Sequence, residues 1–135
     1  MTYLTHEHAR RMIDAALAAA AAEGLRVSVA ITDAGGHLLA FNRAETANLA
    51  TIDIAIQKAR TAVFFQAPTR YVTAAMQPGG AIYTAQHTSG GLSAIPGGIP
   101  VVDEDEAMIG AIGISGGSAE QDDAIAASAV ACSSA

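Results

Sequence analysis

The segment spanning residues 108–117 restricts the possible folds of this chain more than any other part of it. Its sequence, Met-Ile-Gly-Ala-Ile-Gly-Ile-Ser-Gly-Gly, alternates small residues with isoleucine and ends in two successive glycines. A β-strand with so little side chain on one face lets another backbone or a ligand lie close against it. We therefore predict that this segment forms the centre of a sheet.

The glycine-rich bend at the end of this strand is the predicted lip of a ligand site. It precedes a helix, so several N–H groups and the positive end of the helix dipole are expected to converge there. Backbone N–H groups of Ser115, Gly116 and Gly117 could then hold a carboxylate. The alternative is a glycine-rich turn required only by the geometry of the chain.

Hydrophobic periodicity predicts the remaining elements. The stretch 90–102, broken by Pro96-Gly97-Gly98, gives two more apolar β-type runs, and the acidic turn 103–106 follows them. The other elements are a helix from Thr5 to Gly24, a hairpin of Arg26–Thr32 and Leu38–Asn42, helices over Leu49–Phe65 and Pro68–Met76, a further turn at Ala81–Gln86, and a last helix over Ala119–Cys132 that begins with a Ser118/Gln121 capping box. The order α-β-β-α-α-β-β-β-α predicts an α+β fold, a five-stranded antiparallel sheet with helices packed on it, in a single domain over residues 1–135.

The composition excludes several classes of function. Hydrophobic residues make up 51% of the chain and charged residues 15%, which is too apolar for a disordered protein and favours a surface partly covered by other subunits. A net charge of −6 argues against a nucleic-acid partner. The single cysteine, Cys132, excludes an internal disulfide. We see no membrane-spanning run and no signal peptide, so a cytoplasmic location is expected.

Lys58 is predicted to act as a catalytic base or to pair with an acidic ligand. The helix that carries it is apolar on two sides, so the ammonium group rises from partly apolar surroundings that would lower its pKa. Glu120 and Asp122 lie in the first turn of the last helix, and either could serve as the acid partner. The alternative is a structural salt bridge for Lys58, with the acidic residues complementing the helix dipole.

The histidines are the candidate ligands for a cofactor. His6 and His8 are two residues apart on a helix and diverge, so they do not form the i, i+4 pair that a metal ion favours. One axial imidazole is sufficient for haem iron. His87, which precedes Gly91 at the predicted lip, and His8 are the two candidates. The alternative is that each histidine is structural or exposed.

Several motifs together resemble the GlcG/HbpS family, which is also known for haem-binding and haem-degrading-type domains. The matching segments, in the family's order, are residues 33–40 (Asp-Ala-Gly-Gly-His-Leu-Leu-Ala), 58–62 (Lys-Ala-Arg-Thr-Ala), 97–100 (Gly-Gly-Ile-Pro), and 110–117 followed by Glu-Gln-Asp at 120–122. The resemblance implies a profilin-like fold and a homo-oligomer, from a dimer to an octamer. It also implies haem as a cofactor, or an accessory role in operons for hydroxy-acid or diol use.

Three hypotheses on function remain open at this point. The first is a small-ligand-binding protein that binds haem or another small acidic molecule. The second is an isomerase- or lyase-type enzyme that moves protons on a carboxylate- or enol-bearing metabolite with Lys58 and an acid of the last helix. The third is a non-catalytic oligomeric accessory or sensor partner.

Overall fold

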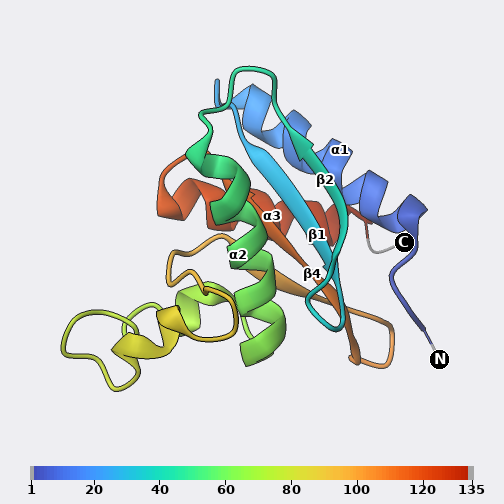
Figure 1. The fold of residues 1–135 in the computed structure, drawn as a ribbon. Helices are drawn as coiled ribbons and strands as arrows, with labels where there is room; N and C mark the ends of the chain where they lie inside the picture. The colour runs from blue at the N-terminus through green and yellow to red at the C-terminus, as the bar shows by residue number, and fades with distance from the viewer. Residues whose placement is uncertain (1, 134–135) are drawn as a thin grey trace.

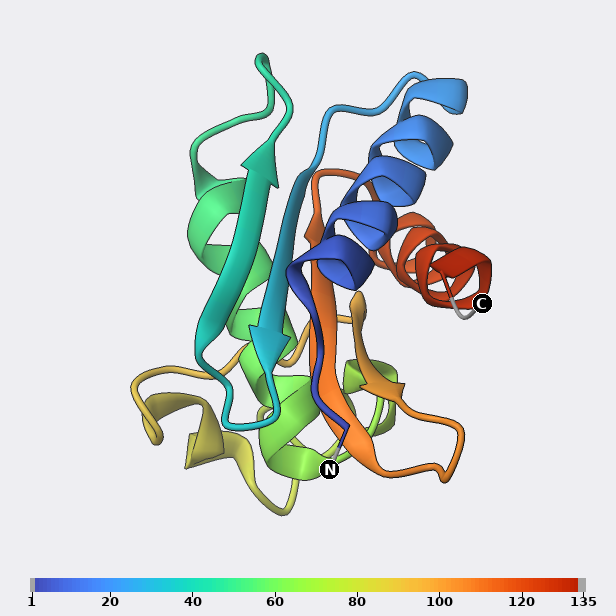
Figure 2. The ribbon, with the colours of Figure 1, turned by 90° about the vertical axis from the view of Figure 1, so that its right-hand side faces the viewer.

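Four antiparallel strands form the sheet in the part of the chain that the computed structural model describes, residues 2–133. The strands β1 (Ser28–Asp33), β2 (Leu38–Arg43), β3 (Gly98–Val102) and β4 (Met108–Ser115) are arranged in the order β2-β1-β4-β3. Helix α2 (Ala50–Phe65) covers one face, and α1 (His6–Ala22) and α3 (Ala119–Ser133) cover the other (Figures 1 and 2). The α+β architecture predicted from the sequence is confirmed.

The central strand lies against a helix backbone, as its small residues predict. A Cβ atom on Gly113 of β4 would lie only 2.0 Å from the carbonyl oxygen of Ala55 in α2. Most of the side chains that α2 buries are also small, while its isoleucines are only half-buried. This close approach of α2 to β4 leaves little room between helix and sheet, and it fixes where Lys58 enters the interior.

The main hydrophobic core lies on the opposite face, between the sheet and the α1–α3 pair. Alternate residues of β1, such as Val29 and Ile31, point into it together with Met12 of α1 and Ile125 of α3. The predicted caps hold: Thr5 accepts the N–H of His8 at the start of α1. At the start of α3, the backbone N–H of each of Ser118 and Gln121 donates to the side chain of the other, which is the predicted capping box.

The predicted fifth strand is wrong. Its segment, residues 90–95, runs alongside α2 as irregular chain. Its backbone groups bond to hydroxyls instead of to a neighbouring strand: Ser93 N–H donates to Thr61 Oγ1, and Ile95 C=O accepts from Thr69 Oγ1, both at 2.9 Å. Because these hydroxyls satisfy the backbone, an apolar segment can be buried here without strand pairing.

The predicted helix over Pro68–Met76 is also wrong in extent. It forms only a short 3₁₀ turn, η1 (Thr69–Tyr71), followed by irregular turns. Several β-branched residues lower the helix propensity of this segment, and the Thr69 hydroxyl is taken by the chain at 95–98. The further turn expected near residues 81–86 is present as η2 (Tyr83–His87), so the order between α2 and β3 is two short 3₁₀ segments rather than a helix and a strand.

Candidate functional site

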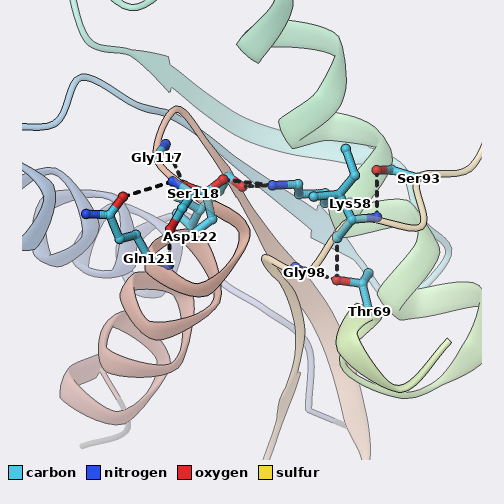
Figure 3. A network of polar contacts seen from close by, with 10 residues as sticks. Lys58, Thr69, Ser93, Gly98, Gly117, Ser118, Gln121 and Asp122 are labelled. Carbon is cyan, nitrogen blue, oxygen red and sulfur yellow. Dashed lines mark hydrogen bonds and ion pairs between the residues drawn. The ribbon is translucent and has the colours of Figure 1, made fainter. Parts of the chain in front are cut away.

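Lys58 and Asp122 form a buried ion pair at the end of β4. The Lys58 Nζ atom lies 2.9 Å from Asp122 Oδ2 and donates a second hydrogen bond to the carbonyl oxygen of Ile114 at 2.7 Å. The two side chains are 1% and 3% exposed. They point toward each other from α2 and α3, so the pair links the helices that cover opposite faces of the sheet (Figure 3).

The start of β3 and the residue before it make room for this lysine. A Cβ atom on Gly97 would lie 2.8 Å from Lys58 Nζ, and one on Gly98 would lie 2.2 Å from the Lys58 carbonyl oxygen. Burial lowers the pKa of Lys58 from its ordinary value, and the negative charge of Asp122 opposes that shift. Because the two glycines carry no side chain, the Lys58 side chain can cross between the two layers and reach the Asp122 carboxylate.

The glycine-rich bend differs from its prediction, because its N–H groups are not all free to bind a ligand. Gly117 N–H donates to Asp122 Oδ1 at 2.8 Å, so the side chain of the chain's own aspartate supplies the carboxylate that the bend was expected to capture (Figure 3). A Cβ on Gly116 would lie 2.3 Å from the Arg26 carbonyl oxygen, so local geometry alone requires a glycine there. A ligand-binding role for Ser115, Gly116 and Gly117 stays a prediction.

The predicted catalytic residues are only partly brought together. Asp122 is the acid that pairs with Lys58, whereas Glu120 is exposed on α3. Lys58 lines neither of two hollows on the described chain, a cavity beside His8 and an open groove between α1 and β2. The geometry of this pair is that of a structural link between layers, and a catalytic role for its members stays a prediction.

His87 and Gly91 lie in the loop region between α2 and β3. His87 is exposed on η2, and Gly91 is half-buried. Arg60 of α2 holds this loop, because its guanidinium donates to the carbonyl oxygens of Gly91, at 2.9 Å, and of Ser89. His87 lines neither the cavity nor the groove, so its predicted role as an iron ligand gains no support from the geometry.

His8 lines a cavity of about 460 Å³ between the start of α1, the end of β3 and the end of α3. This volume falls within the range of roughly 300–1,000 Å³ that is usual for small-molecule and cofactor sites. The walls combine apolar and polar side chains: Thr2, Tyr3, Thr5, His8, Arg11, Val101, Val102, Asp103, Glu104, Ile109, Val130 and Ser133. The second hollow, the open groove of about 610 Å³ between α1 and β2, is lined by polar side chains, with His6 among them, and by the apolar residues Ile13, Ala40 and Phe41.

The His8 imidazole is held in one orientation by α3. Its Nε2 atom lies 3.1 Å from the hydroxyl of Ser133, and that hydroxyl donates to the carbonyl oxygen of Val130. Since the hydroxyl proton is used, Nε2 is the donor to Ser133 and Nδ1 keeps its lone pair. Burial, and to a lesser degree the charge of Arg11, lowers the pKa of His8. The lowered pKa favours the neutral ring, in which one nitrogen is able to ligate a metal.

The sequence pointed to His8 but not to the rest of this cavity. Arg11 had a usable signal, because residues three apart on a helix share a face. Thr5, three residues before His8, had the same signal. The remaining walls had none: they come from residues 2–3, 101–109 and 130–133, which only the folded chain brings together. Cys132, next to Ser133, is exposed and forms no disulfide.

Residues 4–131 match the family described as haem degrading protein HbpS-like. The chain belongs to this family. The match covers nearly the whole of the HbpS-like domain that residues 2–133 form, and it confirms the resemblance to GlcG/HbpS seen in the sequence motifs.

Relatives of this HbpS-like chain carry different names and roles. It is 36% identical over 130 residues to an uncharacterized 15.0 kDa protein in the dhaT-dhaS intergenic region of Citrobacter freundii, covering 96% of this chain and 91% of that one. It is 35% identical over 112 residues to protein GlcG of Escherichia coli, covering 83% and 81%. It is 40% identical over 113 residues to the corrinoid adenosyltransferase PduO of C. freundii, covering 82% of this chain but 33% of PduO, about a third of that enzyme.

Solved structures of the same fold include a haem complex. The HbpS-like chain matches Klebsiella pneumoniae protein ORFY with a TM-score of 0.93 at 32% identity, covering 98% of this chain and 92% of that one. It matches the PduOC–haem complex with a TM-score of 0.89 at 34% identity, covering 97% and 95%. It matches HbpS with a TM-score of 0.88 at 32% identity, covering 97% and 90%.

Clustered metal ligands are absent from the described part of this HbpS-like chain. Within residues 2–133, no group of three or more His, Cys, Asp or Glu side chains is arranged to hold a metal ion. Across the same residues, no helix is long and apolar enough to span a membrane.

Proposed function

We propose that this HbpS-like chain binds haem in the cavity beside His8, with the His8 imidazole as the iron ligand. The observation that supports this most is the chemistry of that cavity: a neutral, oriented imidazole stands in a hollow of cofactor size. The likeness to the PduOC–haem complex over 97% of this chain supports it independently.

The donor set fits a haem group. Val101, Val102, Ile109 and Val130 offer apolar surface for the macrocycle, and Arg11 offers a cation for its carboxylates. Ser133 fixes the ring of His8 through the nitrogen that would not touch iron, which is the usual arrangement behind a metal-ligating histidine. Bound haem would supply redox or gas-ligand chemistry, and this chain's own residues would bind it and exclude water.

Titration of the purified protein with hemin tests the proposal. The wild type should shift the Soret band and saturate. His8→Gln, whose side chain can still bond to Ser133, should lose the histidine-ligated spectrum, while His6→Ala and His87→Ala, at exposed positions, should behave as the wild type. An unchanged Soret spectrum in His8→Gln, or its loss in His87→Ala, would remove His8 from this role.

A second candidate is proton-transfer catalysis on a carboxylate- or enol-bearing metabolite. It is favoured by one observation, the lowered pKa of Lys58 beside the Asp122 carboxylate. Exchange of the α-proton of 2-hydroxy and 2-oxo acids for deuterium, followed by NMR, would reveal such activity. Exchange by the wild type that Asp122→Asn abolishes would support it, and the absence of exchange above buffer for every acid would refute it.

We also propose that the chain forms a homo-oligomer and that it does so in the cytoplasm. Large apolar side chains at the surface, including Tyr3, Leu49 and Tyr71 at about 70% exposure, are suited to contact between subunits. An accessory or sensor role would use the same surfaces. Light scattering at micromolar concentration would show an assembly, and a monomer would exclude it.

A further inference from the structure

The charges around the His8 cavity are unevenly placed. Of the residues that line it, Arg11 on α1 carries the positive charge, and Asp103 and Glu104 at the end of β3 carry the negative charges. These charges would contribute little to the binding of an uncharged apolar ligand. A ligand with a carboxylate would meet attraction at one wall and repulsion at the other.

Arg11 is free to bind a further anion. Its acidic neighbour is Glu7, one turn earlier on α1, at 3.5 Å, and the two side chains are 45% and 72% exposed. A guanidinium has five N–H donors, and an exposed pair of this kind holds the arginine only weakly. Arg11 can therefore turn its remaining donors toward a carboxylate in the cavity, in the fork geometry that suits such a group.

The acidic wall is fixed in place by its own turn. Asp103 Oδ1 accepts the N–H groups of Asp105, at 2.8 Å, and of Ala107, at 3.0 Å. Because these bonds hold the carboxylate in the turn, it cannot swing away from a ligand, and Glu104 beside it adds a second negative charge. The β3 side of the cavity is thus unfavourable for an anion.

From this arrangement we infer that Arg11 is the specificity-determining residue of the cavity, and that its ligand is a flat apolar acid whose carboxylate pairs with Arg11. This inference rests on the proposed haem site, since it assigns the propionates of haem to Arg11. It also extends to iron-free porphyrin acids, for which His8 is not needed as a ligand. The acidic pair at 103–104 fixes the orientation by repelling the carboxylate end.

Three probes separate the contribution of the carboxylates to binding from that of the iron. They are hemin, hemin dimethyl ester, which lacks free carboxylates, and protoporphyrin IX, which lacks iron. Arg11→Gln should lower the affinity for hemin and for protoporphyrin IX by about five- to tenfold, the effect of losing one partly screened charge-assisted contact. The ester should bind equally to the wild type and to Arg11→Gln. Arg10→Gln, which removes the same charge from a neighbouring exposed position on the other groove, should leave all three affinities unchanged.

The opposite wall supplies a matched pair of variants. Glu104→Gln should tighten hemin binding about two- to threefold, while Asp105→Asn, on the same turn but outside the cavity lining, should not. Equal losses in Arg11→Gln and Arg10→Gln, or an equal loss for the ester, would overturn the inference. If hemin binds without a histidine spectrum while protoporphyrin IX still depends on Arg11, the proposed iron ligand fails and the carboxylate contact survives.

Discussion

Two cation–carboxylate pairs in this molecule have opposite characters. Lys58 and Asp122 are almost fully buried and 2.9 Å apart, whereas Arg11 and Glu7 are largely exposed and 3.5 Å apart. Both members of the first pair have further partners within the chain, and Asp122 also accepts the N–H of Gly117. The second pair borders a cavity. The difference teaches that a charged cluster with a perturbed pKa can belong to the fold and need not mark a ligand site.

Breaking the buried pair should have a larger effect than any other single substitution in this comparison. Asp122→Ala leaves an ammonium group buried without its partner, and we expect the free energy of unfolding to fall by about 3–5 kcal/mol. Urea denaturation measures this loss. The double variant Lys58→Met/Asp122→Leu, which removes both charges, should regain most of the lost free energy of unfolding. Arg70→Gln, which breaks the more exposed pair with Asp123, should cost no more than about 1 kcal/mol. A loss of similar size from Asp122→Ala and Arg70→Gln would erase the distinction between buried and exposed pairs.

Filling the space around Lys58 should be the next most damaging change. A Cβ atom on Gly97 would meet Lys58 Nζ and the Ile114 carbonyl oxygen at 2.8 Å, and φ is +131° there. We expect Gly97→Ala to cost about 1–3 kcal/mol, measured by urea or thermal unfolding. Gly79→Ala is the control for backbone strain alone, because it also has positive φ but no atom within 4 Å of the added Cβ. Equal losses of unfolding free energy in Gly97→Ala and Gly79→Ala would show that the buried pair of Lys58 and Asp122 is not tightly enclosed.

A small carboxylate should partly replace the missing side chain of Asp122. In Asp122→Ala, formate can occupy the space between Lys58 Nζ and Gly117 N–H, and ligand binding to the folded state alone raises stability. We expect about 1 kcal/mol of stabilisation at a formate concentration of about five times its dissociation constant, relative to chloride at the same ionic strength. The wild type, whose own carboxylate fills this space, should show no such difference. An equal response in both proteins would contradict this.

The smallest predicted effect is a pH dependence at the open cavity. The pKa of His8 is lowered in the folded protein, so the unfolded chain binds a proton before the folded one does as the pH falls. The stabilisation from neutral His8 is therefore complete above about pH 6.5 and is lost as the pH falls through the lowered pKa. Hemin affinity should weaken over the same range. His8→Gln should remove this part of the pH dependence, and a profile identical to that of the wild type would refute the assignment.

Much of the fold could be predicted because local sequence determined it. The capping box of Ser118 and Gln121, the hairpin after Arg26 and the small-residue strand each depend on neighbours close in the chain. The segment 90–95 could not be predicted, because its backbone partners are the hydroxyls of Thr61 and Thr69, which lie far away in the sequence. Apolar sequence indicates burial there, and only the long-range contacts decide against a strand.

The candidate site, like the fold, could be predicted from the sequence only in part. The sequence indicated that Lys58 would be desolvated and near an acid of the last helix, and both features are present. It could not indicate that Asp122 would also take the N–H of Gly117, because that contact depends on how the bend closes over the helix start. The cavity beside His8 was hidden for a similar reason, since its walls are three segments far apart in the chain.

The most direct test of this division of roles is a hemin titration of two variants in parallel, Lys58→Met/Asp122→Leu and His8→Gln. We predict that the double variant, which has lost both charges of the buried pair, binds hemin with the wild-type Soret spectrum, and that His8→Gln does not. Loss of the spectrum in a folded double variant, together with its retention in His8→Gln, would contradict the assignment of haem to the His8 cavity and return the ligand site to the glycine-rich bend.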